Sequence, residues 1–254
     1  MVKNLLVRGM LAGLAAAALA LVFAWIFGEP QVGAAIALEG HTPHGGHDPV
    51  ATVPEAGADD GPVSRTVQST IGLAAAVGVY GVAVGGIFAL VFALVYGRLG
   101  AFGARATAAL LAVGAFVTVS LVPFLKYPAN PPAVGHPDTI GRRTALYVTF
   151  VTIVVLLGVG AVLLERWLAR RYRNADAAVL AVVAFLAAVT AAALLMPGVE
   201  ELPAEFPAGL LWRFRLASIG THALLWSGMG LFFGLLAERL LTPSAIRANA
   251  PSTV

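Results

Sequence analysis

Six long apolar runs, separated by shorter polar segments, dominate the hydropathy pattern of the chain. A run of about 18 or more apolar residues predicts a membrane-crossing helix, because roughly 20 residues span a hydrocarbon core about 30 Å thick. Backbone groups in lipid must satisfy their own hydrogen bonds, so the runs are expected to be helical despite their alanine, glycine and valine content. The predicted spans are residues 5–27, 71–96, 106–125, 146–164, 177–196 and 216–236.

The composition agrees with a protein embedded in the bilayer. Hydrophobic residues make up 59% of the 254 positions and charged residues 11%, with a mean hydropathy of +0.87, whereas an ordinary globular domain is about 25% charged. The chain has no cysteine, which excludes disulfides, thiolate zinc sites and thiol nucleophiles. We predict an all-α polytopic helical bundle forming a single transmembrane domain over residues 1–254.

The first run also has one feature of a secretory signal peptide, the basic start formed by Lys3 and Arg8. Its apolar stretch is longer than the roughly 7 to 15 residues of a signal sequence, and no small-x-small cleavage site follows it. A retained first helix is therefore the favoured interpretation.

The distribution of charge predicts the orientation of the spans. With the N-terminus inside, the inner segments hold ten of the sixteen basic residues, and the outer segments hold ten of the thirteen acidic ones. Basic residues favour the cytoplasmic side. We therefore expect a multi-pass protein of a bacterial-type cytoplasmic (inner) membrane. The basic residues set topology, so the net charge of +3 does not predict a nucleic-acid partner.

This orientation places every histidine on the outer side or within reach of it. His41, His44 and His47 fall in a long outer loop, residues 28–70, and His136 falls in a second outer loop, residues 126–143. Imidazole is the commonest transition-metal ligand. The His-x-x-His-x-x-His stretch is broken by proline and glycine and can fold around one ion, with a neighbouring carboxylate assisting; the alternative is a solvated linker. The candidate metal ligands are His41, His44, His47, Glu39, Asp48, His136 and His222.

His222 differs from the others because it lies about two turns inside the last span. An ionisable group within a span is costly and predicts a function. Helical spacing places Ser218, His222, Trp226 and Met229 near one face, which predicts an ion path with Ser218 and Met229 as further ligands. The alternative is that His222 simply bonds a carbonyl of a neighbouring helix.

Three glycine pairs with four-residue spacing predict close helix packing. They occur at residues 9 and 13, 81 and 85, and 230 and 234. Gly78, Gly81 and Gly85 also share a face, so a narrow pore wall is the alternative for the second span.

The segment between the third and fourth spans is rich in proline. Residues 126–143 contain four prolines, which fix φ and remove hydrogen-bond donors. We expect a rigid, non-helical lid or docking surface at the outer helix ends.

Several blocks of the sequence resemble one family over most of the chain. They are FGEPQVGAAIALE, SRTVQSTIGL, KYPANPPAVGHPDTIGRR and FRLASIGTHALLW. The pattern is similar to CbtA, the membrane subunit of a predicted cobalt transporter. The resemblance implies cobalt uptake linked to cobalamin supply and a small partner, CbtB, with one span and histidines of its own; a homo-oligomer also remains open. On the matching blocks, the further residues assigned to the path are Glu29, Lys126, Tyr127 and Asn130.

No motif for nucleotide hydrolysis accompanies these features. A G-x-x-x-x-G-K-[ST] loop is absent, but inward movement of a divalent cation at 100 mV releases about 4.6 kcal/mol. The middle of the spans carries no Asp or Glu, so either a broken helix or a partner must assist the ion. We predict transition-metal uptake, with cobalt as cargo and no permanently bound cofactor.

Two other classes of function remain as alternatives. The first is a metal-binding or sensing scaffold subunit without its own permeation path. The second is a membrane enzyme using His136, His222 and Glu200 or Glu201, but neither H-E-x-x-H nor G-x-S-x-G occurs. We therefore predict that the protein is not an enzyme.

Overall fold

The computed structural model describes residues 2–39, 67–98, 100–132, 134–135, 137–199, 201–203 and 205–248. Within these ranges the chain is helical and contains no β-strand, which confirms the all-α prediction. Six helices are long and apolar enough to cross a membrane. They are Val2–Leu38, Ser69–Val95, Ala104–Lys126, Ile140–Leu168, Asn174–Leu195 and Ala208–Leu241.

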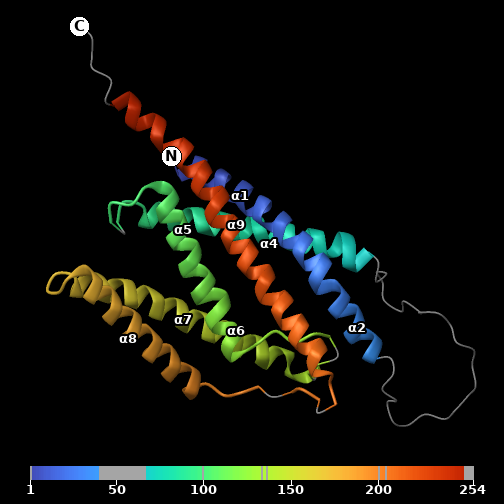
Figure 1. Cartoon of the computed structure of the whole chain (residues 1–254). Coiled ribbons are helices and arrows are strands. Elements are labelled where there is room, and N and C mark those ends of the chain that lie inside the picture. The colour runs from blue at the N-terminus through green and yellow to red at the C-terminus, as the bar shows by residue number, and fades with distance from the viewer. Residues whose placement is uncertain are drawn as a thin grey trace, which may run out of the picture.

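The spans are built from regular helices (Figure 1), and short π-helical segments interrupt or precede some of them. The first span contains α1 (Val2–Phe23), η1 (Ala24–Gly28) and α2 (Glu29–Glu39). The second contains η2 (Gln68–Gly72) and α4 (Leu73–Val95), and the third contains α5 (Ala104–Ala115), η3 (Phe116–Leu121) and α6 (Val122–Lys126). The remaining elements are η4 (Pro137–Thr139), α7 (Ile140–Leu168), α8 (Asn174–Leu195) and α9 (Ala208–Ala248).

Three helix boundaries differ from the sequence predictions. The first helix continues as α2 to Glu39, so the first part of the predicted outer loop is helical. The last helix already begins at Ala208. In the proline-rich segment, η4 and α7 turn residues 137–143 into helix. These ends are more polar than the span centres, and hydropathy alone therefore places them outside the helices.

Two of the π-helical segments end two residues before a proline inside a span. η1 precedes Pro30 and η3 precedes Pro123. Proline has no N–H, and its ring crowds the carbonyl four residues earlier, which belongs to Ile26 and Val119 in these two cases. The widened turn lets each helix continue through the proline. Such π-bulges occur frequently at functional sites.

Close glycine packing joins α1 to α4. A Cβ atom added to Gly13 would lie 2.9 Å from the carbonyl carbon of Gly81 and 2.9 Å from the Cα of Gly85. A Cβ atom added to Gly85 would lie 3.0 Å from the Cα of Gly13. The prediction of close packing is thus confirmed. Because Gly81 and Gly85 face α1, they do not line a pore in this arrangement.

An aromatic core fills the space between α4 and α9. Phe92 and Phe233 are fully buried, with ring centroids 4.9 Å apart in an edge-to-face arrangement. Phe88 packs against Phe233 in the same way, at 5.3 Å. Residues of α1, α4, α5 and α9 share this core, and we call these four helices the glycine-packed bundle.

The α7–α8 hairpin forms a second group of helices beside the glycine-packed bundle (Figure 1). Its small core contains Phe150, Val154 and Val189, with Phe185 and Tyr127 against them. Most other apolar side chains of α8 are exposed, including Leu194 and Leu195. α7 also contacts η3 and α6, so the third span joins the hairpin to the bundle.

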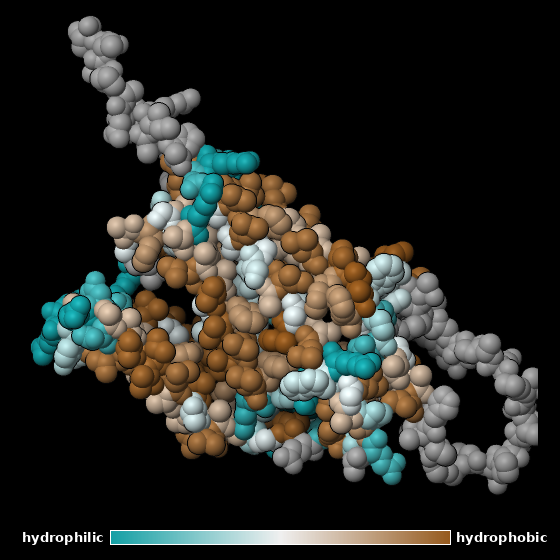
Figure 2. All heavy atoms as spheres, in the orientation of Figure 1, coloured by the Kyte–Doolittle hydropathy of each residue, from teal (hydrophilic) through white to brown (hydrophobic). Residues whose placement is uncertain are grey.

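Polar contacts gather at the two opposite ends of the helices. At one end, Arg105 pairs with Glu238 at 2.5 Å, and the start of α1 lies near the end of α9 (Figure 1). At the other end, Arg143 pairs with Glu201. Figure 2 shows a broad hydrophobic surface along the helices, with hydrophilic residues toward their ends. This pattern fits six alternating membrane crossings.

Candidate functional site

A hydrogen-bonded cluster joins the third span to the last one. The Nε1–H of Trp226 donates to Ser120 Oγ at 3.0 Å, and Ser120 Oγ lies 3.4 Å from His222 Nδ1. Ser120 is 4% exposed and Trp226 is 6% exposed. We call these three residues the Ser120 cluster. It is a polar group within otherwise apolar spans.

The chemistry of the Ser120 cluster leaves His222 able to bind a metal ion. Indole nitrogen only donates, so the serine oxygen must accept from Trp226, but the hydroxyl can still donate to or accept from His222. If Nδ1–H donates to Ser120, the lone pair on Nε2 is free for a metal. Histidine ligands commonly use their second ring nitrogen in this way. At 3.4 Å the contact is long and therefore weak in this arrangement.

Local helix geometry explains why these residues meet. Ser120 lies in η3, three residues before Pro123, where the helix turn is widened. On α9, at 3.6 residues per turn, Arg215, Ser218, His222 and Trp226 fall within an arc of about 80°. We call this arc the His222 face. Its contacts to Ser120 show that it points toward the third span.

The N-terminal end of the His222 face, which is its predicted outer end, is covered by the segment that follows α6. Arg215 Nη2 donates to Asn130 Oδ1 at 2.9 Å, and its Nε donates to the carbonyl of Ala129 at 3.3 Å. The Tyr127 hydroxyl donates to the carbonyl of Pro197 at 2.8 Å. Desolvation raises the pKa of the Tyr127 phenol, so it remains a protonated donor at neutral pH. Lys126 Nζ lies 5.7 Å from the centre of the Tyr127 ring.

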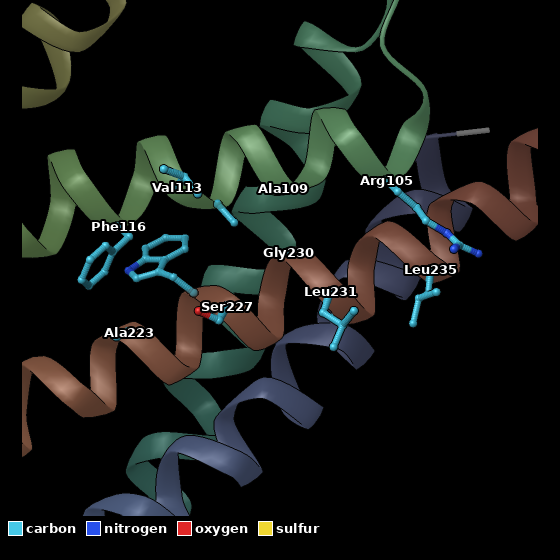
Figure 3. A pocket seen from close by; sticks show the side chains of 11 residues that line it. Arg105, Ala109, Val113, Phe116, Ala223, Ser227, Gly230, Leu231 and Leu235 are labelled. Carbon is cyan, nitrogen blue, oxygen red and sulfur yellow. The ribbon is translucent and has the colours of Figure 1, made fainter. Parts of the chain in front are cut away.

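A groove continues from the Ser120 cluster toward the opposite end of the helices. This cavity of about 400 Å³ lies between α5 and α9 and extends from Trp226 and Phe116 to Arg105. Figure 3 shows Val113 on one wall and Gly230 on the other. Most of the lining is small or apolar, so the groove offers space but few ligands.

The structure brings some of the predicted site residues together. His222 and Trp226 meet at Ser120, and Ser218 lies half-buried on the same face of α9. Met229 is instead fully buried within the hydrophobic core of the bundle. Asn130 contacts Arg215.

The other predicted residues lie apart from this cluster or outside the described ranges. Glu29 is half-buried in the first turn of α2, and Glu39 ends that helix. Glu201, considered above for an enzyme, forms an ion pair with Arg143. The candidates outside the described residues are His41, His44, His47, Asp48, His136 and Glu200.

Sequence reasoning missed Ser120 and Arg215. Ser120 is a lone hydroxyl in an apolar run shortly before a proline, and Arg215 lies seven residues before His222. Their polarity and spacing were visible signals. Their partners lie 102 and 85 residues away along the chain, so the contacts depend on which helices become neighbours.

Within the described ranges, no three His, Cys, Asp or Glu side chains group closely enough to hold a metal ion. The Ser120 cluster therefore offers one nitrogen ligand of its own, and an ion would need further ligands from elsewhere.

Comparisons with known proteins identify one family. A family model described as "Probable cobalt transporter subunit (CbtA)" matches residues 2–238, which is nearly the whole chain. No curated protein and no solved structure matches the chain.

Proposed function

Because the chain belongs to the CbtA family, we propose that it carries cobalt into the cell, with outer-loop histidines capturing the ion and the His222 face guiding it inward. The observation that carries this proposal is the Ser120 cluster. It sets an imidazole, held by a hydrogen-bonded serine, within spans that otherwise consist mostly of apolar side chains. Intramembrane ionisable groups commonly mark ion pathways.

Capture is assigned to the outer loop. His41, His44 and His47 supply nitrogen ligands that suit a late first-row divalent ion, and Glu39 or Asp48 supplies a carboxylate. His136, which lies in the second predicted outer loop, is a further candidate ligand. The membrane potential of a bacterial-type cytoplasmic membrane then favours inward movement of the cation.

The path beyond capture uses the residues at the outer helix ends. Glu29, Lys126, Tyr127 and Asn130 line the entrance in this proposal, and Ser218 and His222 follow along α9. The groove between α5 and α9 supports an onward route toward the cytoplasm. Met229 remains a candidate ligand further along α9 in this proposal, and it is fully buried among apolar residues.

A partner subunit is part of the proposal. The family description names a transporter subunit, and the Ser120 cluster supplies too few ligands by itself. A small single-span protein with histidines, similar to CbtB, would add ligands to the path.

One observation favours a second candidate function. The described residues contain no group of three metal-ligating side chains, as expected for a scaffold subunit that binds metal only in its outer loop. Such a subunit would support metal binding but would carry no flux through its own spans.

Uptake of radiolabelled cobalt into proteoliposomes separates the two functions. The variant H41A/H44A/H47A is compared with the unmodified chain, each with and without the small partner, at limiting and at saturating cobalt. A transporter with a capture loop should lose uptake at limiting cobalt and recover most of it at saturation. If the loop variant shows unchanged uptake at limiting cobalt, the capture role is wrong. If the unmodified chain carries no flux in either assembly, the transport proposal is wrong.

A further inference from the structure

Arg215 lies on the His222 face, between the Ser120 cluster and the outer end of α9. It precedes His222 by seven residues, which corresponds to two turns and about 10 Å along the helix. Because seven residues make almost two full turns, the two side chains start from nearly the same side of α9. An ion moving along this face toward His222 would have to pass the guanidinium.

The guanidinium of Arg215 is held in a fixed position by two acceptors. Its Nη2 donates to Asn130 Oδ1 at 2.9 Å and its Nε donates to the Ala129 carbonyl at 3.3 Å. The acceptors lie on adjacent residues, so the planar guanidinium bridges them with two separate nitrogens. We call Arg215, Ala129 and Asn130 the outer clasp.

The acceptors in the outer clasp are neutral. A carbonyl and an amide oxygen satisfy the guanidinium without cancelling its charge, and arginine stays protonated in proteins. A positive charge at this point repels a divalent cation, and the repulsion is stronger near apolar helices than in water. The closed clasp therefore acts against cation entry both sterically and electrostatically.

Two neighbouring contacts hold the loop side of the clasp in place. Tyr127 donates to the Pro197 carbonyl at 2.8 Å, and Arg143 pairs with Glu201 at 3.5 Å. Both contacts tie the segment after α6 or the start of α7 to the connection before α9. Among the side-chain hydrogen bonds of the described residues, those of Arg215 join this segment to the His222 face itself. Opening the route along this face therefore requires Arg215 to release Asn130 and Ala129.

We propose that Arg215 is a gating residue that closes the outer entrance to the His222 face and excludes cations until the clasp opens; this role rests on the proposed function. The charge of Arg215 and its hydrogen bonds contribute separately. R215Q removes both the charge and the two-nitrogen contact, whereas R215K keeps the charge and loses the planar geometry. N130A removes the amide acceptor and leaves the arginine intact.

Because the chain lacks cysteine, a single introduced cysteine can report on access without background. S218C places a thiol on the His222 face between Arg215 and His222. Its reaction rate with a membrane-impermeant thiol reagent, added to the outside of proteoliposomes without any metal, measures how often the entrance opens. L202C, in the outer connection before α9, is the control for reagent and membrane, because Leu202 is 45% exposed.

R213Q is the matched charge control. Arg213 lies two residues from Arg215 on the same helix, and its side chain is exposed. In the S218C background, R215Q and N130A should each raise the labelling rate roughly tenfold, as expected for loss of a charge-assisted hydrogen bond. R213Q should leave it within about twofold, and the R215Q/N130A pair should add little to either single change.

Equal labelling rates in the R215Q, N130A and R213Q backgrounds would overturn the gating role. N130A keeps the test valid if R215Q fails to fold, because it changes a loop side chain. Cobalt flux measured on cysteine-free vesicles distinguishes the two proposals. If R215Q and N130A speed the labelling of S218C but the vesicles show no cobalt flux, the gating role of Arg215 stands and the transport proposal is wrong. If cobalt flux depends on His222 but R215Q and N130A leave the labelling rate of S218C unchanged, the transport proposal stands and the gating role of Arg215 is wrong.

Discussion

The glycine-packed bundle and the α7–α8 hairpin are both apolar, but they are held together differently. In the most apolar window of α9, 39% of residues are buried inside the protein, against 11% in both α7 and α8. Backbones of the bundle approach so closely that glycine is required at the α1–α4 crossing. The hairpin instead exposes most of its leucine and valine side chains. In lipid, apolarity alone does not drive helices together, so packing geometry distinguishes a core helix from a lipid-facing one.

The Ser120 cluster lies where these two regions meet. Ser120 belongs to η3, which contacts α7, whereas His222 and Trp226 belong to the bundle. The bundle positions His222, and η3 of the third span connects this part of the bundle to α7. The comparison thus predicts that substitutions in the bundle affect stability, and that substitutions at the junction affect function more than stability.

The largest difference is expected for glycine substitutions. G13L places a side chain against the backbone of Gly81 and Gly85 and should cost more than about 3 kcal/mol, because backbone atoms cannot yield as side chains do. G160L in α7 is the control, since an added Cβ there meets nothing within 4 Å. Thermal unfolding in detergent measures both. Equal losses would contradict the distinction between the two regions.

The aromatic core should show the next largest effect. F233A removes a fully buried ring that packs against Phe88 and Phe92 and should cost about 2 to 4 kcal/mol through lost packing and cavity formation. L195A in α8 changes a side chain that is 85% exposed and should stay within about 0.5 kcal/mol. Chemical denaturation in mixed micelles provides the measurement. If L195A cost more than about 0.5 kcal/mol, Leu195 would pack against a partner, and the contrast between a packed bundle and an exposed hairpin would be wrong.

Loss of a single hydrogen-bond donor in the Ser120 cluster, where the bundle and the hairpin meet, should affect both stability and uptake. W226F keeps an aromatic ring but removes the Nε1–H that Ser120 accepts, and should cost about 1 kcal/mol. W212F is the matched control because Trp212 is exposed near the start of α9. Cobalt uptake should fall for W226F and remain unchanged for W212F. Loss of stability without any change in uptake would assign Ser120 and Trp226 to packing alone.

The smallest effect is expected at the opposite end of the bundle. R105Q breaks the ion pair with Glu238, whose side chains are 61% and 39% exposed, and should cost less than about 0.5 kcal/mol because exposed pairs contribute little. Unfolding at low and high salt should give nearly the same difference between R105Q and the parent. A loss of several kcal/mol would show that the bundle depends on charge as much as on glycine packing.

The sequence predicted the fold well because each span is an apolar run long enough to cross a bilayer. It predicted the ends of the first and last helices less well, since Glu29 is polar but still helical and the last helix begins as early as Ala208. The π-helical turns before Pro30 and Pro123 were not predicted, because whether a proline breaks or widens a helix depends on the packing around it.

The candidate site was predicted in part. His222 stood out as an ionisable residue inside a span, and the face that it shares with Ser218 and Trp226 follows from helical spacing. Its contact with Ser120 could not be predicted, because helical periodicity does not say which span lies opposite. Met229 shares the same periodicity but is fully buried in the hydrophobic core, because burial depends on which helices surround α9 at that depth and not on spacing alone.

Cobalt flux at saturating concentration through the H222A variant tests the central claim most directly. T221A is the matched control, because the Thr221 hydroxyl donates to the Ala217 carbonyl of its own helix at 2.8 Å. If the ion passes along the His222 face, H222A should reduce flux by roughly tenfold or more even when capture is saturated, because loss of a residue that merely orients a metal ligand already costs about 10- to 100-fold, while T221A transports normally. Flux through H222A equal to that of T221A would contradict the proposed path.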